Sequence, residues 1–121
     1  MTAKDTVRAL LDRLPNDCSL EDVQYHLMRM SRIRFEAGAR TNWHLHSTGQ
    51  LLLVEEGPGR LQELGDRVVE LRAGQPVYTK PNVKHWHGAS PNEAAVQFSV
   101  YSGTLEWLEA VSDADYLGPG R

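Results

Sequence analysis

Two pairs of histidines are the residues of this chain whose type and spacing best suit metal chemistry. His44 and His46 lie in the stretch HLHSTGQ, and His85 and His87 lie in the stretch KHWHG. On a β-strand, residues two apart point to the same face, so each pair can converge on one point. A single His-x-His on a strand is more often ordinary surface polarity. Two such pairs in one short chain, each close to glycine-rich turns, favour a metal site.

Gln50 ends the first of these stretches and is a candidate partner for the histidines. It follows a tight Ser-Thr-Gly bend and stands at the head of the apolar run LLLV. Its amide can therefore fold back towards the same point from a neighbouring strand. A neutral amide is an unexpected residue at such a place, because a carboxylate would bind a metal ion more tightly.

Short alternating runs, which are needed to position these side chains, fill the chain from about residue 30 to residue 102. The breaks between them are rich in glycine, proline and asparagine, which is typical of an all-β sandwich or barrel. A first strand is expected around Ile33 and Phe35. The later strands are predicted at residues 41–46, 50–56, 60–64, 67–71, 76–80, 85–89 and 94–102.

The last of these strands has a polar row that alternates with an apolar row. Such a pattern suits a pocket wall backed by packing, and it equally suits a polar face turned to solvent. Asn42 shares the face of the first histidine pair, and the first strand can contribute two more residues. The predicted pocket residues are therefore Ser31, Ile33, Asn42, Gln97, Ser99 and Tyr101.

The first thirty residues have apolar residues at helical spacing instead. One stripe ends at Pro15, and Ser19 begins a second one with a capping-box-like Ser-Leu-Glu-Asp. We predict a helical hairpin with helices at residues 4–14 and 20–29; the competing interpretation places residues 23–30 in the first strand. Residues 1–29 would then serve packing or an oligomer contact, and residues 30–121 would form the barrel. Apolar residues at positions 105, 107, 108 and 111 predict a short closing helix.

The composition limits the classes of partner. The 121 residues suffice for one domain, and a formal net charge of -3 gives no reason to expect nucleic acid or an anionic membrane as partner. Cys18 is the only cysteine, which excludes an internal disulfide and a cysteine zinc cluster and fits a reducing compartment. No apolar run approaches the roughly 18 residues of a membrane span, and there is no apolar signal core. We expect a cytoplasmic protein.

The spacing of the first motif resembles that of the cupin family. Gly38, His44-x-His46, Gln50 and Gly57 are spaced as in the first cupin motif, with Gln50 in place of the family's acidic ligand. The resemblance covers about residues 30–102 together with the second motif. It implies a double-stranded β-helix, or jelly-roll, barrel, which would carry the short N-terminal hairpin and the short C-terminal helix as additions.

The second motif runs from Gly74 to His85. It resembles the cupin segment in which a proline-glycine turn precedes the last histidine ligand. This chain departs from the pattern, because Asn82 stands where glycine is usual and Lys80 where proline often stands. Asparagine is the next most tolerant residue of a left-handed backbone, so the turn remains feasible.

The two motifs together are most similar to a group of small bacterial cupins with a single barrel. That group includes manganese-dependent hydroxynitrile lyases and proteins labelled after carboxymuconolactone decarboxylase. The resemblance implies that His87 lies beside a metal as an active-site residue rather than a ligand. It also places a further histidine of the lyases at the position of Gln97, a departure that weakens any transfer of their acid-base chemistry. The ligands that it implies are His44, His46, Gln50 and His85.

Such a set of three imidazoles and one amide oxygen carries no charge. A divalent ion would keep its full double charge there, so it should bind less tightly but polarise water or substrate more strongly. Without a thiolate, a closed structural zinc site is not expected, and open positions remain for substrate. Manganese, iron, nickel, zinc and copper all suit these donors. The resemblance favours manganese or iron.

These features favour an enzyme that acts on a small molecule by Lewis-acid and proton-transfer chemistry, as lyases, decarboxylases, isomerases and cyclases do. His87 would act as general acid and base, or would only orient a ligand through a hydrogen bond. Two alternatives stay open: an iron-dependent dioxygenase, and a non-enzymatic cupin that senses a ligand or serves as a metal-binding accessory protein. Barrels of this size leave apolar outer surface, so we also expect a homodimer.

Overall fold

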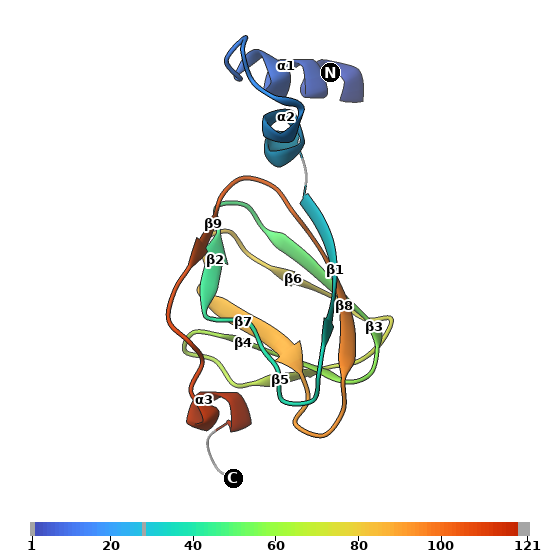
Figure 1. Ribbon diagram of the computed structural model, residues 1–121, viewed down its shortest axis with the longest axis vertical. Coiled ribbons are helices and arrows are strands. Elements are labelled where there is room, and N and C mark those ends of the chain that lie inside the picture. Colours follow the sequence, from blue (N-terminus) through green and yellow to red (C-terminus); the bar gives the residue numbers. More distant parts are fainter. Residues whose placement is uncertain (1, 28, 119–121) are drawn as a thin grey trace.

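Two antiparallel sheets form the barrel in the computed structural model, which describes residues 2–27 and 29–118 (Figure 1). The first sheet has the strand order β1-β8-β3-β6, and the second has the order β5-β4-β7-β2-β9. The first sheet contains β1 (Arg29–Phe35), β8 (Ala95–Tyr101), β3 (Gln50–Glu56) and β6 (Pro76–Thr79). The second contains β5 (Val69–Leu71), β4 (Gly59–Glu63), β7 (His85–Ala89), β2 (His44–His46) and β9 (Leu105–Trp107). The predicted jelly-roll fold is confirmed.

The predicted strands agree with the observed ones within two residues at each end, except that β2 begins at His44 rather than at residue 41. Residues 41–43 are held by a few separate hydrogen bonds instead of a strand ladder. The amide of Thr41 donates to the carbonyl of His87, and the amide of Trp43 donates to that of Glu109. The alternation that continues through β2 therefore does not extend to Asn42.

The closing helix predicted around residues 105–111 is wrong. Residues 105–107 form β9, in which Leu105 pairs with His46 and Trp107 pairs with His44. The C-terminal helix, α3 (Asp113–Leu117), lies further on and is capped by Ser112, whose hydroxyl accepts the amide of Asp115 at 3.1 Å. The apolar spacing was misleading because the pairing with β2 keeps residues 105–107 extended.

The predicted helical hairpin is present as α1 (Ala3–Asp12) and α2 (Leu20–Leu27). Because α2 ends at Leu27 and β1 begins at Arg29, the interpretation that placed residues 23–30 in the first strand is wrong for residues 23–27. Figure 1 shows the hairpin at one end of the barrel and α3 at the other. None of the helices within the described ranges is long and apolar enough to cross a membrane.

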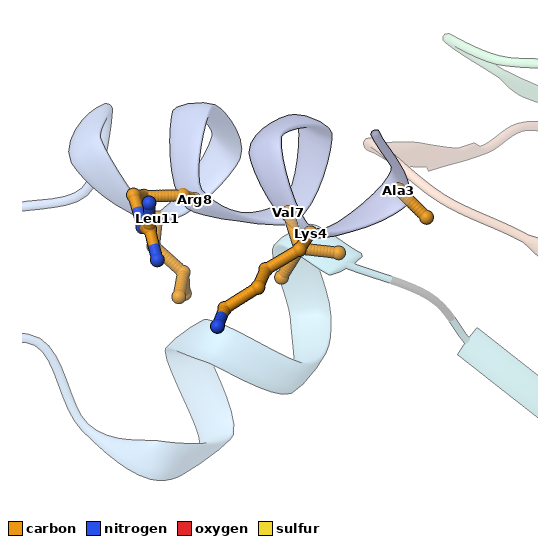
Figure 2. A pocket seen from close by; sticks show the side chains of 5 residues that line it. All are labelled: Ala3, Lys4, Val7, Arg8 and Leu11. Carbon is orange, nitrogen blue, oxygen red and sulfur yellow. The ribbon is translucent and has the colours of Figure 1, made fainter. Parts of the chain in front are cut away.

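A groove of about 450 Å³ lies along α1 and is lined by Ala3, Lys4, Val7, Arg8 and Leu11 (Figure 2). We call it the α1 groove. Its apolar residues Val7 and Leu11 remain 43% and 39% exposed. The role of the hairpin in packing or in an oligomer contact stays a prediction.

The core has parts inside and outside the barrel. Inside, Leu52, Val54, Leu61 and Leu71 pack together from β3, β4 and β5. Outside the second sheet, Trp43 and Trp86 pack against Val111 and Tyr116 of the C-terminal segment. The strand β7 is therefore buried on both faces: its histidines point into the barrel, and Trp86 between them points to this outer cluster.

Candidate metal centre

Three imidazoles meet inside the barrel because of how β2 and β7 pair. His44 lies opposite His85 in the antiparallel register, and His46 follows on the same face of β2. One nitrogen of each ring can be chosen so that all three atoms lie within 4.8 Å of one another. The three side chains are buried. The two histidine motifs are thus brought together as the spacing predicted.

Backbone carbonyls fix the tautomer of two of these rings. Nδ1 of His44 donates to the carbonyl of Asn42, and Nδ1 of His85 donates to the carbonyl of Val83, each over 2.8 Å. A neutral imidazole carries one proton, so Nε2 of each ring keeps its lone pair. This is the arrangement by which proteins commonly orient a histidine that ligates a metal.

His46 lacks any such partner. Neither of its ring nitrogens has a partner with hydrogen-bond geometry, although the side chain is only 3% exposed and the nearby side chain of Gln50 acts to raise the pKa of this ring. Leaving a buried polar group unpaired costs about 1–3 kcal/mol, and such groups are rare in folded proteins. A cation bound by this ring would supply the missing interaction.

Gln50 places an amide oxygen next to these rings. Its Oε1 lies 2.8 Å from Nε2 of His85, and both side chains are buried. The proton of His85 is on Nδ1, so the lone pair of its Nε2 points at the lone pairs of the Gln50 oxygen. A cation bound by both atoms would make this short distance favourable. Three imidazole nitrogens and one amide oxygen therefore fit a divalent transition metal ion.

The turns at Gly49 and Asn82 precede the strands that carry Gln50 and His85. Gly49 precedes Gln50, and a Cβ at this position would lie 2.0 Å from the hydroxyl oxygen of Tyr78, so the exposed ring of Tyr78 would have to move to admit a side chain there. Asn82 has the left-handed backbone that the sequence predicted, with φ of 61°. Its amide donates to the carbonyl of His46 over 2.7 Å, which ties the turn before β7 to β2.

Burial keeps the histidines of the barrel neutral. It lowers the pKa of His44 to about 3 and that of His46 to about 4, and it also lowers the pKa of His85. The pKa of His87 is lowered to about 4 for the same reason. All four rings are therefore uncharged near neutral pH, which is the form that binds a metal ion or accepts a proton.

His87 lies two residues beyond His85 on the same face of β7, but it is not part of the group whose ligand atoms lie within 4.8 Å of one another. Its Nδ1 lies 2.7 Å from Oε1 of Gln97 on β8. The ring of Phe35 meets it edge-on, with the centroids 5.8 Å apart. No other ring nitrogen of the cluster is hydrogen-bonded to it in the described part of the chain.

The remaining predicted pocket residues take different positions. Ser31 and Ser99 share a hydrogen bond of 2.8 Å between β1 and β8, and the ring of Tyr101 lies 4.3 Å from that of His46 between centroids. Gln97 and Ser99 are buried, so the polar row of β8 does not face solvent. Ile33 pairs with Gln97 and shares its face, but β1 is an edge strand and Ile33 remains 44% exposed.

Asn42 differs from the prediction. It lies before β2, its side chain is exposed, and its amide donates to the carbonyl of Leu108. It contributes to the centre through its backbone carbonyl, which accepts the proton of His44. A backbone role of this kind leaves no signal in the residue type.

Sequence reasoning missed four residues around the cluster. The ring of Trp107 lies 4.8 Å from that of His44, and Thr79 lies opposite Gln50 with its buried hydroxyl unpaired. By register, Arg29 shares a face with Tyr101, and Glu63 shares one with His85, both partly exposed. Only Trp107 lies in a run with any strand-like signal, the alternation of Leu105-x-Trp107, and the same apolar spacing also fits a helix.

Comparisons with known proteins agree with this geometry. The sequence profile described as "Cupin domain" matches residues 31–101. An (R)-mandelonitrile lyase of Granulicella tundricola is 40% identical over 94 residues, which cover 74% of this chain and 72% of that protein.

Solved structures show the same fold. A cupin-like protein of Thermotoga maritima is 37% identical, with a TM-score of 0.76, over 84% of this chain and 80% of its own. An RmlC-like cupin of Methanocaldococcus jannaschii is 19% identical, with a TM-score of 0.60, over 66% of this chain and 72% of its own.

Proposed function

This chain belongs to the cupin family, and we propose that it is a metal-dependent enzyme of the lyase type that acts on a small molecule. The ligands would be His44, His46, Gln50 and His85, as the similarity to hydroxynitrile lyase cupins implied. The observation that carries the proposal is the unpaired buried ring of His46, next to the lone pairs that His85 and Gln50 turn towards each other. These donors suit several divalent metals, of which we favour manganese or iron.

We propose substrates that carry a hydroxyl group next to the bond that breaks. A divalent ion bound by a neutral donor set would supply Lewis-acid chemistry, polarising a substrate oxygen or nitrile. His87 is neutral, and Nε2 has no hydrogen-bond partner among the described residues, so a lone pair is available there to take a proton; burial lowers the pKa of this ring to about 4, which makes it a weak base. The row of Ser31, Ser99 and Tyr101 would line the substrate pocket together with Ile33.

For a cyanohydrin, these parts account for a balanced reaction. His87 takes the hydroxyl proton, the bond between the carbinol carbon and the nitrile carbon breaks, and the oxygen becomes a carbonyl. Cyanide leaves with the bonding electron pair and takes the proton from His87, which returns to its neutral form. No oxidant is consumed, which separates this reaction from a dioxygenase reaction on the same donors. The cyanohydrin class is chosen because the 40% identical relative is named a mandelonitrile lyase.

The test is aldehyde release from mandelonitrile by protein loaded with Mn(II) or Fe(II). We expect turnover in the loaded protein and a loss of about 100-fold or more in kcat for His87→Ala, which should keep its metal. His46→Ala should lose both metal and turnover. Full turnover in His87→Ala would overturn the role of His87.

A panel of aliphatic and aromatic cyanohydrins extends this test. No turnover on the whole panel, with stoichiometric metal bound, would overturn the lyase proposal. Oxygen uptake by the Fe(II) form with phenolic or enediol substrates would instead identify a dioxygenase. Tight binding of a small molecule without turnover would identify a binding protein.

A further inference from the structure

Gln97 holds the ring of His87 from the side opposite to its free nitrogen. Oε1 of Gln97 lies 2.7 Å from Nδ1 of His87, while its Nε2 donates to the carbonyl of Gly88 over 2.7 Å. Gln97 is buried, so water does not compete for either contact. Both ends of the side-chain amide are hydrogen-bonded, one to the carbonyl of Gly88 and one to the ring nitrogen of His87.

The contact with Gly88 determines which way round the amide lies. A carbonyl oxygen only accepts, so the atom of Gln97 that faces Gly88 must be the amide nitrogen. The atom that faces His87 is then the amide oxygen, which only accepts as well. The hydrogen bond therefore requires a proton on Nδ1 of His87, and in the neutral ring this leaves Nε2 with its lone pair.

The surrounding backbone leaves room for this amide and little more. A Cβ at Gly59 would lie 2.7 Å from Nε2 of Gln97 and 3.2 Å from the carbonyl oxygen of Gly88. Gly59 on β4 pairs with Ala89 on β7, next to that carbonyl. Gly59 thus leaves space for the side-chain amide of Gln97 to bridge β7 and β8. The hydrogen bonds at both ends hold that amide in one orientation.

We propose that Gln97 is a positioning residue that fixes His87 in the Nδ1-protonated tautomer, so that Nε2 works as a proton acceptor. This rests on the proposed function for its catalytic meaning, since it explains why the ring can take a proton from substrate. The tautomer itself does not depend on metal or turnover.

Ring ¹⁵N shifts measured by long-range ¹H–¹⁵N NMR test the proposal on the full chain without metal, at about pH 8, where histidine is neutral. The His87 signals are assigned by their loss in His87→Phe. In the wild type we expect a protonated Nδ1 and an unprotonated Nε2. Gln97→Met keeps the side-chain length but removes both hydrogen bonds. The Nε2-protonated tautomer of His87 should then become populated. Gln97→Glu should keep the Nδ1-protonated tautomer, because one carboxylate oxygen still accepts from Nδ1, while its other oxygen loses the hydrogen bond to Gly88.

Gln62→Met is the matched control. Gln62 is also buried, and both ends of its side-chain amide are hydrogen-bonded on the other face of β7. Its Oε1 accepts from Nε1 of Trp86 at 2.9 Å, and its Nε2 donates to the backbone carbonyl of Asp66 at 3.0 Å. This variant loses comparable hydrogen bonds and should leave the His87 shifts unchanged. If Gln97→Met fails to fold, Gln97→Asn, which is too short to reach both partners, should give the same change of tautomer.

An Nε2-protonated ring in the wild type, or an unchanged Nδ1-protonated ring in Gln97→Met and Gln97→Asn, would overturn the proposal. On a cyanohydrin that the wild-type protein turns over, Gln97→Met should lower kcat about 10- to 100-fold while KM changes little, since only proton transfer is impaired. An absence of turnover in the wild type would count against the proposed function and would leave the tautomer result standing.

Discussion

At the scale of single residues, the neutral Gln50 sets the charge of the donor set. Its amide oxygen lies beside His85 where a carboxylate would add a negative charge. We expect Gln50→Glu to tighten metal binding at least tenfold, about 1.4 kcal/mol, because opposite charges attract strongly at a buried site. The same change should reduce the electrophilic strength of the metal and alter turnover.

Competition with a metal chelator measures this affinity. Gln62→Glu, which adds the same charge on the outer face of the second sheet beside Trp86, serves as the control and should leave the affinity nearly unchanged. If Gln50→Glu changes neither affinity nor turnover, Gln50 is not a ligand.

The buried histidines also give the metal-free protein a defined pH dependence. Burial lowers the pKa of His44 from 6.5 to about 3, and those of His46 and His87 from 6.5 to about 4. Between these values the unfolded chain binds more protons than the native state. The free energy of unfolding should therefore be highest above pH 6.5 and fall on acidification to about pH 4, by up to about 1.4 kcal/mol per pH unit for each group.

Urea unfolding at about pH 7.5 and about pH 5 checks this slope. His87→Leu removes one titrating ring and should show a shallower fall. Equal stability at the two pH values would mean that these rings are not buried in the metal-free protein.

Residue types and spacing sufficed to predict the histidine cluster, because alternation on a strand determines the face of each side chain. They did not suffice for Asn42, which acts through its backbone, nor for Thr79, which lies opposite Gln50 only because the strands β3 and β6 pair. The partners of His87 and Gln97 likewise depend on which strands are neighbours, and that is a property of the whole sheet.

At the scale of elements, the C-terminal segment fastens the outside of the second sheet. The hydroxyl of Tyr116 donates to the carbonyl of Ala89 over 2.5 Å, and the guanidinium groups of Arg40 and Arg60 lie 4.3 and 5.5 Å from its ring centre. Because its ring is buried against Trp86, Tyr116→Ala should lower the free energy of unfolding by about 3–5 kcal/mol. Tyr116→Phe should lower it by about 1 kcal/mol, the usual share of one hydrogen bond.

Urea unfolding of the metal-free variants measures both effects. Tyr78→Phe, at an exposed position on β6, should change stability by less than about 0.5 kcal/mol. A Tyr116→Ala protein as stable as the wild type would show that the C-terminal segment does not pack on the barrel in solution.

Among the elements, the longer strands were predictable because alternation and turn residues agree in them. The strand β9 was not, since it has three residues and its apolar spacing also fits a helix. Its strand state comes from pairing with β2, which is more than fifty residues away along the chain.

At the scale of the whole molecule, the helical hairpin exposes apolar side chains to which the fold and the metal centre assign no role. The α1 groove leaves Val7 and Leu11 partly exposed even though α1 contacts α2, and a helix of ten residues is marginal in water unless its apolar face is covered. We propose that this face contributes to the homodimer expected from the sequence. Sedimentation should show a dimer for the wild type at micromolar concentration and a monomer for Val7→Asp combined with Leu11→Asp.

Ala9→Asp places the same charge on α1 outside the residues that line the groove, and it should remain a dimer. A monomeric wild type would exclude the homodimer. A dimeric double variant would place the contact elsewhere on the molecule.

Metal content per chain tests the central claim most directly. We expect protein expressed with Mn(II) or Fe(II) available to contain close to one transition metal ion per chain by elemental analysis. His46→Ala should lose most of this metal, whereas His87→Ala should keep it. No stoichiometric metal in the wild type, or an undiminished content in folded His46→Ala, would contradict the assignment of this histidine cluster as a metal centre.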